Sequence, residues 1–434
     1  HKAIRRQRQM CIRDRGYGMT EFLVNRSYAD KYNLIACAIG HHIYESRWLR
    51  NPEYLNQIIH TWYRGNEGGP MAKMTKFSSW NADAVLGRYM VDGNKEFLLD
   101  MVKDLEAEYA RWEKTNRLSN GLYWQGDVQD GMEESISGGR RKQYARPTIN
   151  SYMYGNAKAL SLIGIMTGDE GMAMKYGLKA DSIKTLVQDK LWNTDHHFFE
   201  TMRGDASAEV REAIGYIPWY FNLPDASSQY DVAWKEVMDE KGFSAPYGLT
   251  TAERRHPEFR THGVGKCEWD GAIWPFASAQ TLTAMANFMN NYPQTVLTDS
   301  VYFHQMERYV ESQHHRGRPY IGEYLDEVTG YWLKGDQERS RYYNHSTFND
   351  LMITGLIGLR PRMDNTVEVN PLIPEGKWDY FCLDNVLYHG RNLTILWDKD
   401  GSRYQRGKGL HIYVDGKEVG HADTLTRVLC ENVL

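Results

Sequence analysis

Cysteine is scarce in this sequence, which has 5 among its 434 residues. The cysteines are odd in number and widely scattered, with no Cys-x-x-Cys pair and no cysteine–histidine spacing typical of a metal site. A disulfide framework and a zinc site are therefore both disfavoured. We expect the protein to need no metal and no cofactor.

An excess of charge of one sign is also absent, because the formal net charge is only −4. Without a basic patch, the sequence shows no sign of nucleic-acid binding. No apolar run reaches the roughly 20 residues of a membrane-spanning helix. The longest run, residues 351–359, is broken by Thr354, Gly355 and Gly358. We therefore expect no nucleic-acid partner and no membrane span, while the oligomeric state stays open.

Residues 1–15 lack both an initiator methionine and the apolar stretch of a signal peptide. They are basic and have no helical period, so we interpret them as a non-native or disordered segment outside the fold. The compartment is accordingly open. We expect a periplasmic or secreted protein if a signal peptide is missing from this sequence, and a cytoplasmic one otherwise.

Helical periodicity dominates residues 16–360. Turn signals separate about ten segments in which apolar residues recur at steps of three and four. No sequence repeat is visible, which disfavours a solenoid. We therefore predict an all-α, closed helical toroid that carries its site on loops at one end. The predicted helices are residues 29–48, 54–63, 82–90, 95–112, 148–166, 172–191, 231–240, 272–289, 294–313 and 345–356.

The period changes near Pro361. Residues 366–369, 393–397 and 410–414 alternate as strands do, and Asp415-Gly416 is typical of a hairpin turn. Residues 361–434 are thus predicted to form a small β module that covers part of the toroid. Residues 16–360 are predicted to be the catalytic domain, which we expect to lack its first helices.

Aromatic residues are abundant, with 13 tryptophans and 29 tyrosines. Aromatic and acidic residues gather in three segments that are far apart in the sequence, namely residues 121–135 and 266–275, which contain tryptophans, and residues 320–330, which contain tyrosines. An aromatic face can cover the C–H surface of a sugar ring while carboxylates bind its hydroxyl groups. Three such segments between helices therefore suggest one carbohydrate-binding cleft with a pair of catalytic carboxylates.

Each segment also has a simpler interpretation. The acids Asp127, Asp130, Glu133 and Glu134 would be solvated surface, although the neighbouring Trp124 is wrong for such a surface. The acids Glu323, Asp326 and Glu327 could flank a helix as favourable charges. Asp270 could cap the helix that begins at Pro275. Capping alone would not need Trp269 and Trp274 on either side of it.

These segments together resemble the (α/α)6-barrel glycoside hydrolases that include trehalases, processing α-glucosidases and mannosylglycerate hydrolase. Residues 267–274 are similar to the QWD-x-P-N-x-W signature of trehalases, with Glu268 for Gln and without the Pro-Asn pair. Residues 269–275 fit the W-R-G-P-x-W-P pattern of the α-glucosidases more closely, with Asp270 for Arg and Ala272 for Pro. The resemblance spans roughly residues 26–359 and implies an (α/α)6 toroid.

The resemblance also implies which residues are catalytic. Residues 131–135 fit a G-W-D-x-S motif that holds the general acid of these enzymes, which places the acid on Glu133, with Asp130 as its competitor. Residues 323–330 resemble the E-Y-x-(N/D)-P-x-T-G stretch that holds the base, which places the base on Glu323. Hydrolysis of an oligosaccharide or glycoside with inversion is implied. The expected sugar-binding residues are Trp124, Asp127, Arg140, Trp269, Asp270 and Trp274.

Two other functions remain open at this stage. A glycoside phosphorylase on a related toroid would need a phosphate pocket in place of a base, which Arg339, Arg341 and His345 could supply. A non-catalytic glycan-binding protein would keep the tryptophans but would direct Glu133 and Glu323 into solvent or into ion pairs. The identity of the sugar, its anomer and its linkage depend on the shape of the pocket.

Overall fold

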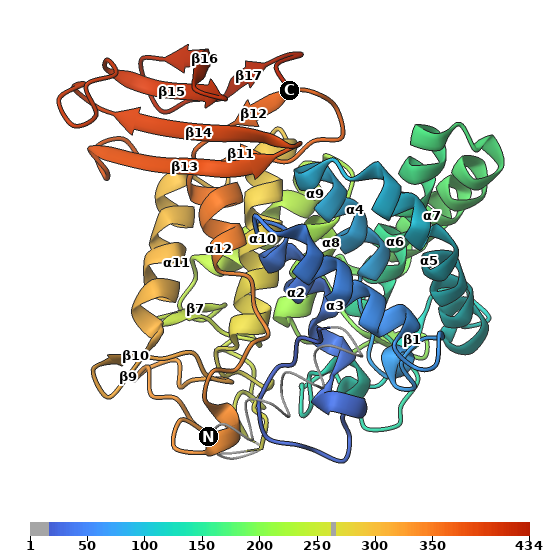
Figure 1. Cartoon of the computed structure of the whole chain (residues 1–434). Helices are drawn as coiled ribbons and strands as arrows, with labels where there is room; N and C mark the ends of the chain where they lie inside the picture. The colour runs from blue at the N-terminus through green and yellow to red at the C-terminus, as the bar shows by residue number, and fades with distance from the viewer. Residues whose placement is uncertain (1–16, 262–265) are drawn as a thin grey trace, which may run out of the picture.

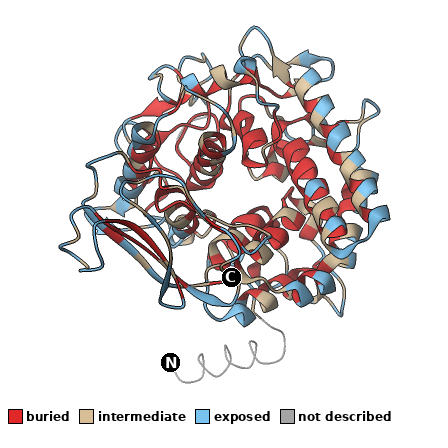
Figure 2. Ribbon diagram, turned by 90° about the horizontal axis from the view of Figure 1, so that it is seen from above, coloured by how far each residue is buried: buried red, intermediate tan, exposed pale blue. Residues whose placement is uncertain are grey.

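The structure is a computed structural model that describes residues 17–261 and 266–434. The segment predicted to be non-native or disordered, residues 1–15, lies outside the described residues. The helices form a ring, which Figure 2 shows along its axis, and a group of strands lies at one end of the ring (Figure 1). The predicted helical toroid with a C-terminal β module is therefore confirmed.

The inner wall of the ring is a closed cycle of helices. Within the described residues α2 contacts α4, and the contacts continue through α6, α8, α10 and α12 until α12 contacts α2 again. Because the cycle is closed, each inner helix buries its apolar side against two neighbouring inner helices. The helical domain is thus a ring and not an open solenoid. The inner helices are α2 (Ile39–Ser46), α4 (Asn81–Asp92), α6 (Pro147–Thr167), α8 (Ile217–Tyr220), α10 (Pro275–Asn291) and α12 (Asn349–Leu351).

Outer helices follow most inner ones along the chain and complete helical hairpins. Side chains at their N-termini cap several of them, such as Asn51 before α3, Asn94 before α5 and Asp169 before α7. These caps agree with the turn signals in the sequence. The outer elements are α3 (Pro52–Arg64), α5 (Lys95–Asn116), α7 (Glu170–Lys190), α9 (Ser228–Asp231) with the 3₁₀ turn Val232–Val237, and α11 (Asp299–Ser312).

Four predicted helices are shorter than expected, and one of them, predicted at residues 294–313, is helical only over α11 (Asp299–Ser312). The helix predicted at residues 29–48 is confined to α2, because Tyr32 and Asn33 have positive φ angles of 61° and 62° that a helix does not tolerate. Residues 231–240 form only α9 and the 3₁₀ turn that follows it. Residues 345–356 are reduced to α12 and a π-helical turn, Met352–Leu356. The short inner helix α8 was not predicted.

The C-terminal strands form two antiparallel sheets. One has the order β13-β14-β15-β16 and the other β11-β12-β17. The predicted hairpin at Asp415-Gly416 is confirmed as the turn between β15 and β16, where both residues have positive φ angles. The strands are β11 (Leu359–Arg360), β12 (Val367–Val369), β13 (Tyr380–Tyr388), β14 (Arg391–Asp398), β15 (Gly409–Val414), β16 (Lys417–Ala422) and β17 (Val428–Cys430).

The β module and the long loops occupy opposite ends of the ring (Figure 1). The module is fixed to the helices by the bond from His389 N to the Val91 carbonyl at 2.7 Å and by the contact of Trp378 with Phe303 of α11. The loops of the other end carry short strands. The strands β1 (Trp124–Gln125), β2 (Tyr144–Ala145), β5 (Met202–Arg203) and β6 (Ala206–Ser207) form one sheet in that order, and the separate pairs are β3 (Trp192–Asn193) with β4 (Phe198–Phe199), β7 (Ser244–Ala245) with β8 (Gly248–Leu249), and β9 (His314–His315) with β10 (Arg318–Pro319).

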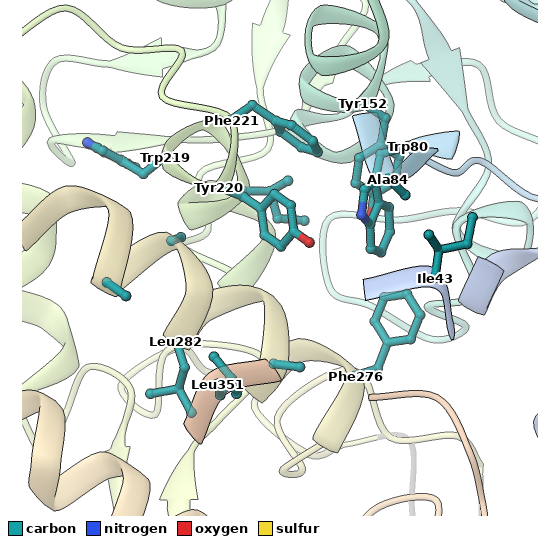
Figure 3. Packing of buried hydrophobic residues seen from close by; sticks show 14 of the residues in the cluster. Ile43, Trp80, Ala84, Tyr152, Trp219, Tyr220, Phe221, Phe276, Leu282 and Leu351 are labelled. Carbon is teal, nitrogen blue, oxygen red and sulfur yellow. The ribbon is translucent and has the colours of Figure 1, made fainter. Parts of the chain in front are cut away.

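Large aromatic residues fill the ring between its helices. Figure 3 shows Trp80, Tyr152 and Phe276 from three inner-wall segments together with Tyr220 and Phe221. The ring centroids of Trp80 and Tyr152 lie 4.8 Å apart. This packing holds the inner helices at fixed positions and so gives the loops a rigid support. Among the described residues no helix is long and apolar enough to cross a bilayer, and no cluster of His, Cys, Asp or Glu fits a metal ion.

Candidate active site

A hollow of about 350 Å³ is lined by residues from several segments of the helical domain that are far apart in the sequence. The first acidic segment contributes Glu133, the tryptophan segment contributes Trp269 and Trp274, and the second acidic segment contributes Glu323. The three segments that the sequence singled out therefore meet in one place. Other residues that line it are Glu21, Phe22, Tyr28, Ile35, Cys37, Lys76, Phe77, Val128, Gly131, Arg140, Cys267, Phe276, Arg339, Tyr343 and His345.

A stack of aromatic rings forms one wall of this hollow. The rings of Trp269 and Trp274 lie 4.3 Å apart and within 19° of parallel, and Trp274 stacks in turn on Tyr324 at 4.5 Å. Trp274 immediately precedes α10, and Pro275 takes the first helical position, where its missing N–H costs nothing. The wall is therefore a fixed apolar face of the kind that sugar rings bind.

The stack and Glu323 are held together by the backbone. Ile273 and Leu325 exchange two hydrogen bonds of 3.0 Å, which ties the residue before Trp274 to the residue after Tyr324. A Cβ atom on Gly322 would lie only 2.4 Å from the ring of Trp332, so a side chain at this position would force the loop away. Glycine before Glu323 thus permits the close approach that places the carboxyl group at the hollow.

Glu323 is buried in a cationic environment. Its carboxyl group accepts hydrogen bonds from Arg339 at 3.0 and 3.1 Å and from Lys334 at 3.3 Å. The hydroxyl group of Ser340 adds a bond of 3.0 Å. Two cations and a hydroxyl group thus surround the Glu323 carboxyl group, an arrangement suited to a general base.

Glu133 has the opposite environment. The 3₁₀ turn Asp127–Asp130 ends at Gly131, whose φ of 73° turns the chain toward the hollow. Burial, followed by the negative charges of Glu323 and Asp127, raises the pKa of Glu133 to about 7. No side chain among the described residues donates a hydrogen bond to its carboxyl group. Glu133 therefore retains its proton near neutral pH, as a general acid must.

The other predicted sugar-binding residues divide into two groups. Arg140 lines the hollow and forms an ion pair of 2.8 Å with Glu134. Trp124, Asp127 and Asp270 do not occur among the described residues that line it. Trp124 belongs to β1, where it pairs with Ala145. The interpretation of Asp270 as a helix cap is wrong, because Trp274 occupies the N-cap position of α10.

Asp130, the alternative general acid, has a structural role. Its carboxyl group forms an ion pair of 2.7 Å with Arg146 and accepts hydrogen bonds from Ser78 and Thr148. The side chains of Asp130 and Arg146 are both completely buried. A carboxyl group that is buried and bonded to three side chains in this way has no open side for a substrate.

Asp130→Asn is accordingly expected to act on stability. Removing one partner of a buried ion pair typically costs about 3–5 kcal/mol, because the other charge is left without compensation. We expect the free energy of unfolding to fall by that amount in urea or thermal denaturation. The protein that remains folded should still cleave substrate. A stable Asp130→Asn variant without activity would indicate that Asp130, and not Glu133, is the general acid.

Sequence reasoning gave no role in the site to three polar residues, Glu21, Lys334 and Tyr343, and it named Arg339 only for a phosphate pocket. Lys334 and Arg339 bond to Glu323, and Glu21 and Tyr343 bond to each other at 3.2 Å. Lys334 and Arg339 follow Glu323 by only 11 and 16 residues, so their proximity to the predicted base was a usable signal. No local signal identifies Glu21, because Tyr343 is 322 residues away in the sequence.

Family models match both the helical domain and the β module. Residues 31–346 match the model of the mannosylglycerate hydrolase MGH1-like glycoside hydrolase domain, a stretch that includes both carboxyl groups and the aromatic stack. The chain belongs to this family. Residues 359–421 match the C-terminal domain of glycosyl hydrolase family 65, which corresponds to most of the β module.

Solved structures extend the comparison. A protein named sialidase is 84% identical with a TM-score of 0.96, over 97% of this chain and 39% of that chain. The chain thus spans well under half of that longer protein. The GH63 mannosylglycerate hydrolase from Thermus thermophilus in complex with glucose is 12% identical with a TM-score of 0.59, over 78% of this chain and 96% of that chain. An uncharacterized conserved protein from the same organism is similar to the same degree, with 12% identity and a TM-score of 0.58.

Proposed function

We propose that this chain hydrolyses a glycosidic bond in an oligosaccharide or glycoside, with inversion at the anomeric carbon. The observation that carries the proposal is the pairing of two differently tuned carboxyl groups in one indole-lined hollow. Burial raises the pKa of Glu133 to about 7, whereas Arg339 and Lys334 surround Glu323 with positive charge. Carboxyl groups whose environments differ in this way are suited to be acid and base respectively.

In the proposed reaction Glu133 donates its proton to the glycosidic oxygen as the bond to the anomeric carbon breaks. Glu323 removes a proton from a water molecule, whose oxygen forms the new bond on the opposite face of the sugar. Inversion requires the two carboxyl groups to lie roughly 6.5–9.5 Å apart, which leaves room for that water. Trp269 and Trp274 support the sugar ring, and Arg140 lies at the hollow where a further part of the substrate would bind.

A panel of 4-nitrophenyl α- and β-glycosides, together with oligosaccharides, tests the activity and identifies the sugar. The anomer of the first product is read by proton NMR before mutarotation. Inversion is expected. Product with the anomeric configuration of the substrate would contradict the role of Glu323 as a base and would make it a nucleophile, whereas no turnover of any glycoside would favour a glycan-binding protein.

The pH dependence should follow the protonation of Glu133. Its pKa of about 7 means that the acid is protonated below that pH and loses its proton above it. We expect kcat/KM for an unactivated glycoside to fall on the alkaline side with a midpoint near 7. An alkaline limb that is unchanged in Glu133→Gln would show that another group carries this titration.

The phosphorylase alternative has little support in the geometry. Arg339 is already paired with Glu323, and burial lowers the pKa of His345 to about 3, so that its ring is neutral. The site therefore offers a carboxylate where a phosphorylase would bind an anion. We expect the same rate of cleavage with and without inorganic phosphate, and formation of a sugar phosphate would refute hydrolysis.

A further inference from the structure

A third acidic residue lines the hollow, and the proposed reaction does not use it. Glu21 is only 4% exposed and is positioned by the segment before α2. It lies outside residues 31–346, so the family match makes no statement about it. Among the described residues no lysine, arginine or histidine forms an ion pair with Glu21. Burying a carboxyl group without a neighbouring cation lowers the stability of the fold, so a function in the hollow would account for its presence.

The hydrogen bonds of Glu21 leave acceptor positions open. The thiol of Cys37 donates to Oε1 at 2.5 Å, and the hydroxyl group of Tyr343 donates to Oε2 at 3.2 Å. Each carboxylate oxygen accepts about two hydrogen bonds. One position on each oxygen is therefore available to a ligand in the hollow, which Cys37 and Tyr343 also line.

Hydrogen bonds from other segments hold the backbone around Glu21 in place. The Glu21 carbonyl accepts a bond of 2.6 Å from Asn344 N, beside Tyr343. The side chain of Asn33 donates to the Phe22 carbonyl at 2.6 Å and accepts from Arg26 N at 3.1 Å. These bonds would hold the segment in place without the carboxyl group, so anchoring the chain does not require an acid at position 21.

Glu21 is also close enough to both catalytic carboxyl groups to feel their charge. Burial raises the pKa of Glu21 to about 7, and the charges of Glu133 and Glu323 act in the same direction. The three acids therefore face a common volume. A sugar bound between Glu133 and Glu323 would present its hydroxyl groups to Glu21, which can accept from them when ionised and donate to them when protonated.

We propose that Glu21 is a specificity-determining residue that hydrogen bonds a hydroxyl group of the sugar whose glycosidic bond is cleaved. This inference rests on the proposed function and adds a requirement to it: the substrate must carry a hydroxyl group that reaches the wall formed by Glu21, Cys37 and Tyr343. Sugars that lack this group or invert its configuration are poor substrates, because a buried acid is then left without its partner.

The test combines variants of Glu21 with deoxy substrates. Glu21→Met keeps the volume and removes both acceptors, and we expect kcat/KM for the best 4-nitrophenyl glycoside of the panel to fall by about 10- to 100-fold. The matched control is Glu108→Met, because Glu108 also accepts from a tyrosine hydroxyl group, at 2.5 Å from Tyr63, but does not line the hollow. This control should leave kcat/KM unchanged.

The decisive comparison uses the four monodeoxy derivatives of that glycoside. One derivative lacks the hydroxyl group that Glu21 binds. The wild-type protein and Glu21→Met should cleave that derivative with nearly equal kcat/KM, because neither protein can make the contact. An equal loss for the parent and for every deoxy derivative would show a merely structural role and overturn the inference. If Glu21→Met does not fold, as judged by circular dichroism, Glu21→Gln and Tyr343→Phe carry the same comparison.

Failure of this inference can be separated from failure of the proposed function. If Glu133→Gln and Glu323→Gln lose activity while Glu21→Met behaves as the wild-type protein, only the role of Glu21 is wrong. If Glu133→Gln and Glu323→Gln remain fully active, the acid–base assignment itself is wrong, whatever Glu21 does.

Discussion

Glu323→Gln is expected to lower kcat by about 10²–10⁴-fold, the usual contribution of a general base. The amide keeps the size of the side chain and can still accept from Arg339 and Lys334, but it does not remove a proton from water. KM should change little, because the aromatic stack of Trp269 and Trp274 is left intact. Steady-state kinetics with an oligosaccharide substrate provide the measurement.

The control for this variant is Glu338→Gln. Glu338 directly precedes Arg339 in the chain and is exposed, and it is not among the described residues that line the hollow. Its kcat should equal that of the wild-type protein. If Glu323→Gln kept its activity, the cations around Glu323 would have to be explained as a structural ion-pair network, and the proposed base would be lost.

Glu133→Gln is the second variant with a large expected effect, and its effect should depend on the leaving group. A sugar alcohol leaves only with a proton, so cleavage of an oligosaccharide should slow by about 10²–10⁴-fold. A 2,4-dinitrophenolate leaves without protonation, so the corresponding aryl glycoside should be cleaved at a rate much closer to that of the wild-type protein. The ratio of the two losses is the diagnostic quantity.

Glu134→Gln serves as the neighbouring control. Glu134 forms an ion pair with the exposed Arg140 and is adjacent to Glu133 in the sequence. We expect it to treat both leaving groups as the wild-type protein does. Equal losses for both substrates in Glu133→Gln would contradict the role of Glu133 as the acid and would indicate a general effect on binding or folding.

Much of the fold follows from local pattern. The helices α3 to α7 lie within a few residues of their predicted ranges, because apolar spacing and side-chain caps act within one or two turns. The helix predicted at residues 29–48 is too long, because apolar residues at helical spacing begin before Tyr32 and Asn33, which have positive φ angles. The side chain of Asn33 instead bonds to the backbone of Phe22 and Arg26. Contacts of that kind leave no periodic signal.

The site shows the same division. Glu133, Glu323, Trp269 and Trp274 were predicted from short motifs, and the structure brings them to one hollow. Asp130 is also acidic and lies only three residues from Glu133, yet its partner Arg146 makes it structural. Sequence proximity does not distinguish the two acids, because the difference between them lies in which charges the fold places beside each.

A crystal structure of Glu323→Gln with a bound, uncleaved oligosaccharide tests the central claim most directly. We predict that the Glu133 carboxyl group lies within about 2.6–3.2 Å of the glycosidic oxygen, the reach of a proton donor. A water molecule should lie between residue 323 and the anomeric carbon on the opposite face of the ring. A sugar seated on the tryptophans with its glycosidic oxygen turned away from Glu133 would contradict the account.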